Sequence, residues 1–352
     1  MAADECWVIE EYRYRPCSAP QREFRSVASL HNHSMHSLEN IATLNRVMAM
    51  PFMRPFSEIL QRAFGLEAVE NLDYADVHYN PPHTPAQVLK LEFESVRRLG
   101  FDSLIFALTD HDNVCGALQL ADDPEVEPDK IALGEELSVE FRDRLFHLGV
   151  IGIPRDQLLK LHNRLQAAAR EQRLDELFEL LRSTGCLVII NHPLLPWDGK
   201  DIQPLPTLEF IEKFGWAIDA LEFNGMRRRE ENDAVLKLAR QTRKPVVGGG
   251  DSHMLMPSSA LCASRDARSL SEFIREVKQG RTATIVRREY YAPLGWKLFL
   301  RTLSFIAQYR RIALYKDIPI ESVIGKERVL LDPVGRLARG FLCTVSALGL
   351  AR

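Results

Sequence analysis

The stretch Val27-Ala28-Ser29-Leu30-His31-Asn32-His33 joins a short apolar run to two histidines separated by one residue. The apolar run predicts a buried strand, and residues i and i+2 of an extended chain point to the same face. Both imidazoles can therefore reach one point at the end of this strand, which suits a metal ion. A His-x-His pair alone is a weak signal, so its meaning depends on how the other predicted strands end.

Further apolar stretches predict six more strands, most of them separated by helical segments, and nearly all end in polar residues. They are 103–108, 131–133, 145–150, 186–190, 216–221 and 245–247. Helices are predicted over about 84–99, 155–182 and 229–242. Buried strands that alternate with helices indicate a parallel sheet. In a barrel of parallel strands the carboxyl ends converge on one face, whereas a doubly wound open sheet, the competing fold, gathers ligands mainly at its switch point.

The composition is that of an ordinary globular protein. The chain has 352 residues, a formal net charge of −3 and a pI of about 6.4, which does not favour a nucleic-acid binder and leaves small acidic substrates open. Its six cysteines form no Cys-x-x-Cys pair, so we expect a reducing compartment and no thiolate zinc site. The sequence shows no signal peptide and no run that could span a bilayer, and we expect a cytoplasmic protein.

Six of the ten histidines lie in or at the ends of predicted strands, together with three carboxylates. The histidines are His31, His33, His111, His147, His192 and His253, and the carboxylates are Asp110, Glu136 and Asp251. A single strand histidine is more often a hydrogen-bonded core residue. Six with carboxylates are hard to explain by packing, because buried polar groups are costly without partners. Such ligands favour zinc, manganese or iron over calcium.

The ordered set of motifs resembles the PHP (polymerase and histidinol phosphatase) family of metal-dependent phosphoesterases. The motifs are His31-x-His33, Thr109-Asp110-His111, Gly134-Glu135-Glu136-x-Ser138, His147, Asn191-His192-Pro193 and Gly250-Asp251-Ser252-His253. The resemblance covers about residues 26–287. It implies a distorted seven-stranded (β/α)7 barrel that binds two or three divalent metal ions (zinc, manganese or iron) and hydrolyses phosphoesters.

The resemblance also implies how the ligands are shared. One metal would be held by His31, His33, Glu136 and Asp251. Glu136 would bridge to a second metal, which His147 and His192 complete.

His111 and His253 would hold a third metal, for which the family uses a further ligand shortly after His-x-His. The usual Ser-Asp-Gly is replaced here by Ser37-Leu38-Glu39-Asn40. Glu39 has about the right offset and is the expected ligand. The alternatives are His36, His78, His83 and Asp76.

Several other residues are candidates for the chemistry. Asp251 and Asp110 would orient or deprotonate the water, although Asp110 would equally well fix a histidine tautomer. Arg227, Arg228 and Arg229 are candidates to bind a phosphate, with a solvated helix start as the alternative. The three glycines 248–250 would let the backbone approach the metals, or form a flexible turn.

The barrel is predicted to carry three additions. Residues 1–25 form an N-terminal extension or edge element. Residues 39–82 form an insertion after the first strand, either a lid or plain packing. Residues 288–352 form a helical C-terminal extension that docks on the barrel, forms a homo-oligomer interface or contacts an anionic membrane surface.

The leading hypothesis for the function is hydrolysis of a small phosphomonoester, such as a nucleotide or phosphorylated metabolite. An exonuclease or phosphodiesterase acting on single-stranded nucleic acid is the alternative enzyme; it would need a basic groove with stacking aromatics, which the net charge does not favour. A non-catalytic metal-binding regulatory module is the alternative from another class.

Overall fold

A computed structural model describes residues 6–10, 12–40, 78–81, 83–194, 204–253, 256–293 and 296–297. The chain divides into two compact units, Met1–His36 with His83–Ala292 and Ser37–Pro82 with Pro293–Arg352. In the second unit, β4 (Glu39–Asn40) pairs antiparallel with β5 (His78–Tyr79). Most of the predicted insertion 39–82 and of the predicted extension 288–352 lies outside the described residues.

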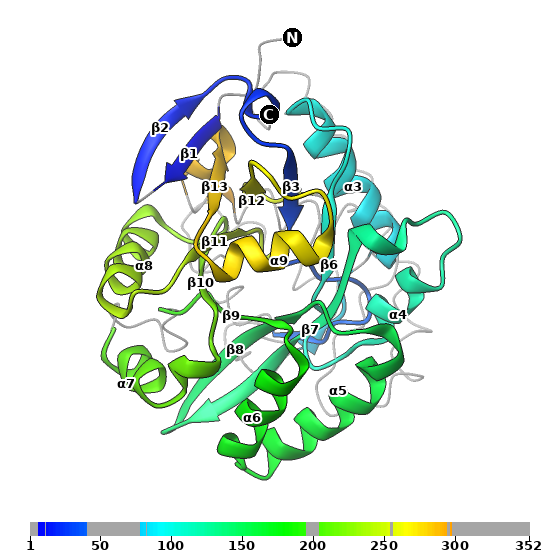
Figure 1. Cartoon of the computed structure of the whole chain (residues 1–352), viewed down its shortest axis with the longest axis vertical. Helices are drawn as coiled ribbons and strands as arrows, with labels where there is room; N and C mark the ends of the chain where they lie inside the picture. Colours follow the sequence, from blue (N-terminus) through cyan, green and yellow to red (C-terminus); the bar gives the residue numbers. More distant parts are fainter. Residues whose placement is uncertain are drawn as a thin grey trace, which may run out of the picture. The chain divides into compact units, whose positions relative to one another are not determined.

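The first unit is built on one eleven-stranded sheet in the order β11-β10-β9-β8-β7-β6-β3-β12-β13-β1-β2. The strands are β1 (Cys6–Glu10), β2 (Arg13–Cys17), β3 (Ser26–Ser29), β6 (Ile105–Leu108), β7 (Ile131–Phe141), β8 (Arg144–Ile151), β9 (Leu187–Asn191), β10 (Ala220–Asn224), β11 (Val246–Gly249), β12 (Ala260–Ser264) and β13 (Thr282–Arg287). The pairs β3–β6, β6–β7, β9–β10 and β10–β11 are parallel. Figure 1 shows the sheet with its covering helices.

The predicted mixed α/β class is confirmed, but the closed seven-stranded barrel is not. Among the described residues, the hydrogen-bonded sheet is one row of eleven strands that begins at β11 and ends at β2. β8 runs antiparallel to both β7 and β9, because Arg142 and Asp143 form a two-residue turn with φ of 50° and 60° that reverses the chain. The sheet still curves back on itself: a Cβ on Gly248 of β11 would lie 2.5 Å from the Leu261 carbonyl oxygen of β12.

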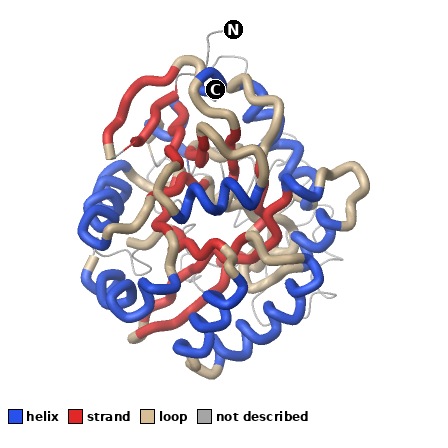
Figure 2. Tube along the Cα trace, viewed as in Figure 1, coloured by secondary structure: helices blue, strands red, loops and turns tan. Residues whose placement is uncertain are grey.

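The described α-helices are α3 (Pro85–Arg98), α4 (Cys115–Ala121), α5 (Arg155–Arg170), α6 (Leu174–Thr184), α7 (Leu205–Phe214), α8 (Arg229–Thr242) and α9 (Leu270–Lys278). They surround the strands of this sheet, except that α9 lies in front of the strands at the middle of the view (Figure 2) and packs on residues inside them. The helices predicted over 84–99 and 229–242 are confirmed. Thr84 caps the first through its side chain, which accepts from the Gln87 backbone N–H. The single helix predicted over 155–182 is wrong, because the chain turns at Gln172 with φ of 56°.

An aromatic cluster fixes the β7–β8 hairpin against α6 and α7. The rings of Phe146 and Phe210 stack with centroids 4.2 Å apart, and those of Phe178 and Phe214 with centroids 4.3 Å apart. Each buried phenylalanine stabilises the fold by roughly 1.5–3 kcal/mol. The β7–β8 hairpin, which also contains polar residues, is therefore firmly packed against these two helices. Among the described residues, every helix is too short or too polar to cross a membrane.

Candidate metal centre

Strand ends of the first unit bring the predicted histidines and carboxylates together. His31 and His33 follow β3, His111 follows β6, and His192 follows β9. Glu136 and His147 lie within the β7–β8 hairpin, whereas Asp251 and His253 follow β11. All of these side chains are at least 85% buried. Residues far apart in the sequence thus form one buried cluster of ionisable groups.

Glu136 lies at the middle of this cluster, and its two carboxylate oxygens face different histidines. Oε2 lies 3.0 Å from Nε2 of His31, 3.2 Å from Nε2 of His33 and 3.3 Å from Nε2 of His111. Oε1 lies 3.2 Å from Nε2 of His192 and 3.3 Å from Nδ1 of His147. A carboxylate with two separately surrounded oxygens has the geometry of a ligand that bridges two metal ions.

The potential ligand atoms fall into several groups whose members lie within 4.8 Å of one another. The groups within the first unit are His31 with Glu136 and His192, His31 with His33 and Asp251, His111 with Glu136 and His147, and His33 with His111 and His253. Imidazole nitrogens and carboxylate oxygens at this spacing are the donor set of zinc, manganese and iron sites. The residues therefore fit a cluster of divalent metal ions.

The carboxylate of Asp251 divides its contacts between two sides. Its Oδ1 lies 3.3 Å from Nδ1 of His253 and 3.8 Å from Nε2 of His33. Its Oδ2 lies 3.4 Å from the guanidinium of Arg227 and 3.4 Å from the amide nitrogen of Asn224. One oxygen thus faces the histidines while the other is held by hydrogen-bond donors.

Two of these residues have a strained backbone. His192 has φ of 30° and Asp251 has φ of 49°, a region that residues other than glycine rarely adopt. Such strain costs roughly 1–3 kcal/mol per residue and concentrates at functional sites.

Asp110 contacts the loop that follows His33. Its carboxylate accepts hydrogen bonds from the backbone N–H of Ser34 at 2.5 Å and from its hydroxyl at 2.8 Å. Its backbone carbonyl accepts from the N–H of Glu136 at 3.2 Å. The carboxylate therefore holds the loop that contains Ser34, and its predicted role toward the water stays a prediction.

The three consecutive arginines take different positions. Arg227 reaches Asp251, and its side chain is 23% exposed. Arg228 pairs with Glu231, and Arg229 pairs with Asp233, both along their own helix. The structure therefore brings Arg227 to the cluster. Arg228 and Arg229 instead have the exposed contacts of a solvated helix start.

The predicted third-site ligands have different surroundings. Glu39 belongs to the second unit, and its role stays a prediction. The imidazole of His36 lies 3.0 Å from the side chain of Gln119, which takes it toward α4. Burial lowers the pKa of His83. The side chain of His78 and all of Asp76 lie outside the described residues.

Sequence reasoning assigned no role to Glu222, Asn191 and Asn224, which the structure places at the cluster. Glu222 Oε1 lies 2.6 Å from Nδ1 of His31, and Asn191 donates to Oε1 of Glu136 at 2.9 Å. Glu222 and Asn224 end an apolar strand with the same i, i+2 spacing as His31 and His33. This spacing was the signal that could have identified them.

The glycines at 248–250 lie where an added Cβ would collide with neighbouring atoms, and their predicted approach to the metals stays a prediction. A Cβ on Gly249 would lie 1.8 Å from Oε1 of Glu222, and one on Gly250 would lie 1.9 Å from the Ser258 hydroxyl. These positions are glycine because neighbouring side chains occupy the space of a Cβ.

The pKa shifts describe a strongly coupled set of charges. Burial opposes ionisation of Glu136, but His31, His111 and His147 hold the pKa of its carboxyl well below the usual range. Burial likewise disfavours the charged form of His31, yet Glu136 and Glu222 raise its pKa well above the ordinary value. Burial lowers the pKa of His147 to about 4. The cluster therefore contains both ionised carboxylates and a neutral imidazole that is suited to metal binding.

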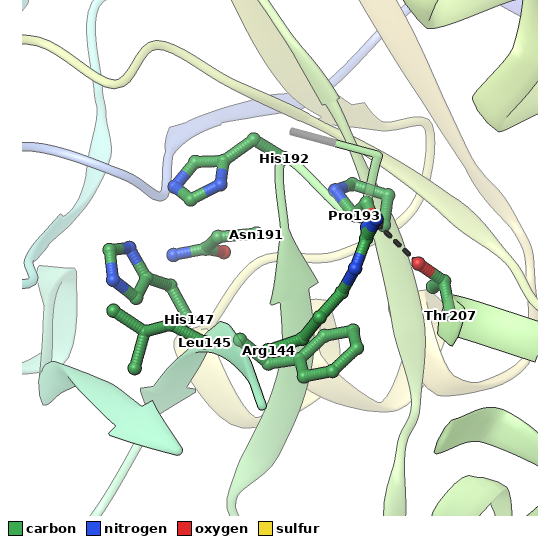
Figure 3. A pocket seen from close by; sticks show the side chains of 8 residues that line it. Arg144, Leu145, His147, Asn191, His192, Pro193 and Thr207 are labelled. Atoms are coloured by element: carbon green, nitrogen blue, oxygen red, sulfur yellow. Dashed lines mark hydrogen bonds between the residues drawn. The ribbon is translucent and has the colours of Figure 1, made fainter. Parts of the chain in front are cut away.

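A hollow adjoins the cluster on the side of β8 and β9. Its lining comprises Arg144, Leu145, Phe146, His147, Asn191, His192, Pro193 and Thr207. In Figure 3 the imidazoles of His147 and His192 and the amide of Asn191 point into the same space. Thr207 donates to the carbonyl of Pro193 at 2.7 Å, which ties α7 to the segment after β9.

Comparison with protein-family models finds no match, and neither does comparison with curated proteins. Among solved structures, the chain is similar to a provisionally named metal-dependent phosphoesterase from Bifidobacterium adolescentis, with 17% identity over 55% of this chain and 90% of that one and a TM-score of 0.35. It is also similar to a two-domain protein from Bacteroides vulgatus that contains a predicted PHP-like metal-dependent phosphoesterase. The identity is 16% over 57% of this chain and 60% of that one, and the TM-score is 0.37.

A third similar structure is an amidohydrolase from Chromobacterium violaceum, with 15% identity, coverage of 49% of this chain and 83% of that one, and a TM-score of 0.36.

Proposed function

We propose that the chain is a metal-dependent phosphoesterase that hydrolyses a small phosphomonoester at a cluster of two or three divalent metal ions. The observation that carries this proposal is Glu136, whose two oxygens each face their own set of histidines at 3.0–3.3 Å. A metal cluster is the simplest reason to bury so many imidazoles around one carboxylate.

The proposed ligands follow these contacts. His31, His33, Glu136 and Asp251 would hold one metal, and Glu136 would be shared with a second metal completed by His147 and His192. The short separation of His33, His111 and His253 supports a third site, for which Glu39 is the proposed further ligand. Zinc, manganese and iron all suit this donor set.

Divalent ions held by these residues would supply polarisation of the phosphoryl oxygens and activation of a water. The residues of the chain bind and orient the substrate around them. Arg227 is the proposed partner of a phosphoryl oxygen, because its guanidinium already lies at the edge of the cluster beside Asp251. Asp251 is the proposed acceptor of a proton from the attacking water, and Asp110 is the proposed anchor of the loop after His33. The closed arrangement of the sheet as a PHP-type barrel and a location in the cytoplasm belong to the same proposal.

A metal-supplemented screen tests the function. Purified protein is analysed for bound metals and then assayed with aryl phosphate, phosphomonoesters, phosphodiesters, single-stranded oligonucleotides and amides in the presence of Zn²⁺, Mn²⁺ or Fe²⁺. We expect two or more equivalents of metal and the fastest turnover with a monoester. His192→Ala should abolish this turnover.

The screen also separates the alternatives. Preferred cleavage of oligonucleotides would replace the phosphatase by a nuclease, and metal binding without any hydrolysis would support a regulatory module. A protein that binds no transition metal would overturn the proposal.

A further inference from the structure

We propose that Glu222 is a positioning residue that orients His31 and His192 for metal binding without itself being a ligand. This inference rests on the proposed metal-dependent function, and it concerns a residue of β10 that no motif identified. Among the described residues, the candidate ligand groups do not include Glu222.

The first contact of Glu222 is with His31. Its Oε1 lies 2.6 Å from Nδ1 of the imidazole, whose Nε2 faces Glu136 at 3.0 Å. Because an ionised carboxylate only accepts hydrogen bonds, Nδ1 carries the hydrogen and donates it to Glu222. The ring is thereby oriented with Nε2 toward the centre of the cluster, where a metal would bind.

The second contact is with the backbone of His192. The N–H of His192 donates to Oε2 of Glu222 at 2.7 Å. His192 has φ of 30°, so this hydrogen bond secures a residue whose backbone is strained. Glu222 therefore positions two candidate ligands, one through its ring and the other through its backbone.

A third donor completes the surroundings of the carboxylate. Asn224 donates from its amide to Oε2 of Glu222 at 2.8 Å, and the same amide nitrogen lies 3.4 Å from Oδ2 of Asp251. Both oxygens of Glu222 thus accept hydrogen bonds. A glutamine at this position would offer one oxygen and one NH₂ group, so either His31 or the pair of donors at Oε2 would face another donor.

The packing around Glu222 allows little rearrangement. The residue is 1% exposed, and a Cβ on Gly249 would lie 1.8 Å from its Oε1. Three groups, the His31 ring, the His192 N–H and the Asn224 amide, lie at hydrogen-bond distance from the two oxygens, so the acceptor-only form of the carboxylate fits this geometry.

The test compares the wild type with Glu222→Gln, which preserves shape and removes the charge and one acceptor. Glu276→Gln is the matched control, since Glu276 is 3% exposed and accepts from Ser264 away from the cluster. Competition with a chromophoric chelator gives the dissociation constants for Zn²⁺ and Co²⁺. We expect Glu222→Gln to weaken binding about 10–100-fold and to alter the visible spectrum of bound Co²⁺. Glu276→Gln should match the wild type.

A second measurement uses the metal-free wild type and needs no variant to fold. We expect ¹⁵N–¹H NMR to show a strongly downfield, hydrogen-bonded proton on Nδ1 of His31. The absence of that proton would overturn the inference, and so would wild-type metal affinity together with an unchanged Co²⁺ spectrum in Glu222→Gln. A wild type that binds no metal but keeps the Nδ1 proton would refute the proposed function and retain the positioning of His31.

Discussion

The guanidinium of Arg227 lies 3.4 Å from Oδ2 of Asp251, on the opposite oxygen from the one that faces His33 and His253. A cation at the edge of a cluster of carboxylates and histidines is suited to a phosphoryl group that carries charge of its own. This relationship distinguishes Arg227 from the two arginines that follow it.

Arg227→Ala should lower kcat/KM for the preferred phosphomonoester by about 10²-fold, because it removes a hydrogen-bond donor aimed at developing charge. Metal content should stay at the wild-type value. Arg229→Ala is the matched control: its pair with Asp233 is exposed, and we expect less than about a 3-fold change. Equal losses in both variants would contradict the role of Arg227. Steady-state kinetics with parallel metal analysis distinguishes these outcomes.

Glu136→Gln should remove at least one equivalent of metal and slow hydrolysis by more than about 10³-fold, since a bridging ligand supports several kcal/mol of charge stabilisation. The control is its neighbour. Glu135 points to the other face of β7 and contacts His162 at 2.8 Å. Glu135→Gln should retain the full metal content by elemental analysis, and a protein that keeps its metal in Glu136→Gln would refute the bridging assignment.

Asp110→Asn tests whether Asp110 holds the loop or removes a proton. The substitution turns one acceptor oxygen into a donor that faces the N–H or hydroxyl of Ser34. We expect Asp110→Asn to lower kcat at every pH without changing the shape of the pH–rate profile. Ser34→Ala should lower kcat in the same way but by a smaller factor. If only the limb of the pH–rate profile that reports the catalytic base is lost, Asp110 is instead the group that removes the proton.

The pair of His162 and Glu135 should make stability depend on pH. The hydrogen bond that His162 donates to Glu135 raises the pKa of His162 above 6.5 in the folded protein. The pair therefore stabilises the fold fully below that unfolded-state value, and its contribution is lost as pH rises through the folded pKa. His162→Gln should cost on the order of 1 kcal/mol in urea unfolding at pH 6 and less at pH 9.

A double-mutant cycle with Glu135→Gln isolates this coupling from other effects of the substitution. Both pH values are measured in chelator, so that metal binding does not contribute. A coupling free energy that does not decrease between pH 6 and pH 9 would argue against a charged His162 in the folded state.

Gly249→Ala should disturb the same carboxylate as Glu222→Gln by a different route. The added Cβ would lie 1.8 Å from Oε1 of Glu222, so the carboxylate must move. We expect destabilisation of about 1–3 kcal/mol and weaker metal binding. In Gly215→Ala, the control, the nearest atom is a methyl of Ile211 at 3.1 Å, and metal affinity should not change. Thermal unfolding and chelator competition measure both effects.

The cluster was predictable from the sequence because strand ends are local features. An apolar run followed by His31-x-His33 reveals both the strand and the direction of its side chains. The same reasoning applied to Thr109-Asp110-His111 and to Asn191-His192-Pro193. What each strand end contacts is not a local property, and the partner of His31 is Glu222, which lies 191 residues further along the chain.

The direction of β8 was missed for a related reason. A two-residue turn forces neighbouring strands to run antiparallel, but Arg142-Asp143 lacks the glycine or asparagine that usually marks such a turn. The role of Asp110 was equally inaccessible, because a carboxylate beside a metal ligand has the same sequence pattern whether it contacts water or Ser34. The sequence also did not distinguish Arg227 from Arg228 and Arg229. Their different contacts depend on where α8 begins, which is at Arg229.

The left-handed backbone of His192 and Asp251 has a consequence for engineering this protein. Glycine adopts those φ values without strain, so His192→Gly would relieve a conformational cost while deleting a proposed ligand. A library selected for heat resistance alone would tend to enrich such changes and lose the active molecule. Thermostabilisation of this chain should therefore exclude both positions from diversification and screen every variant for metal uptake.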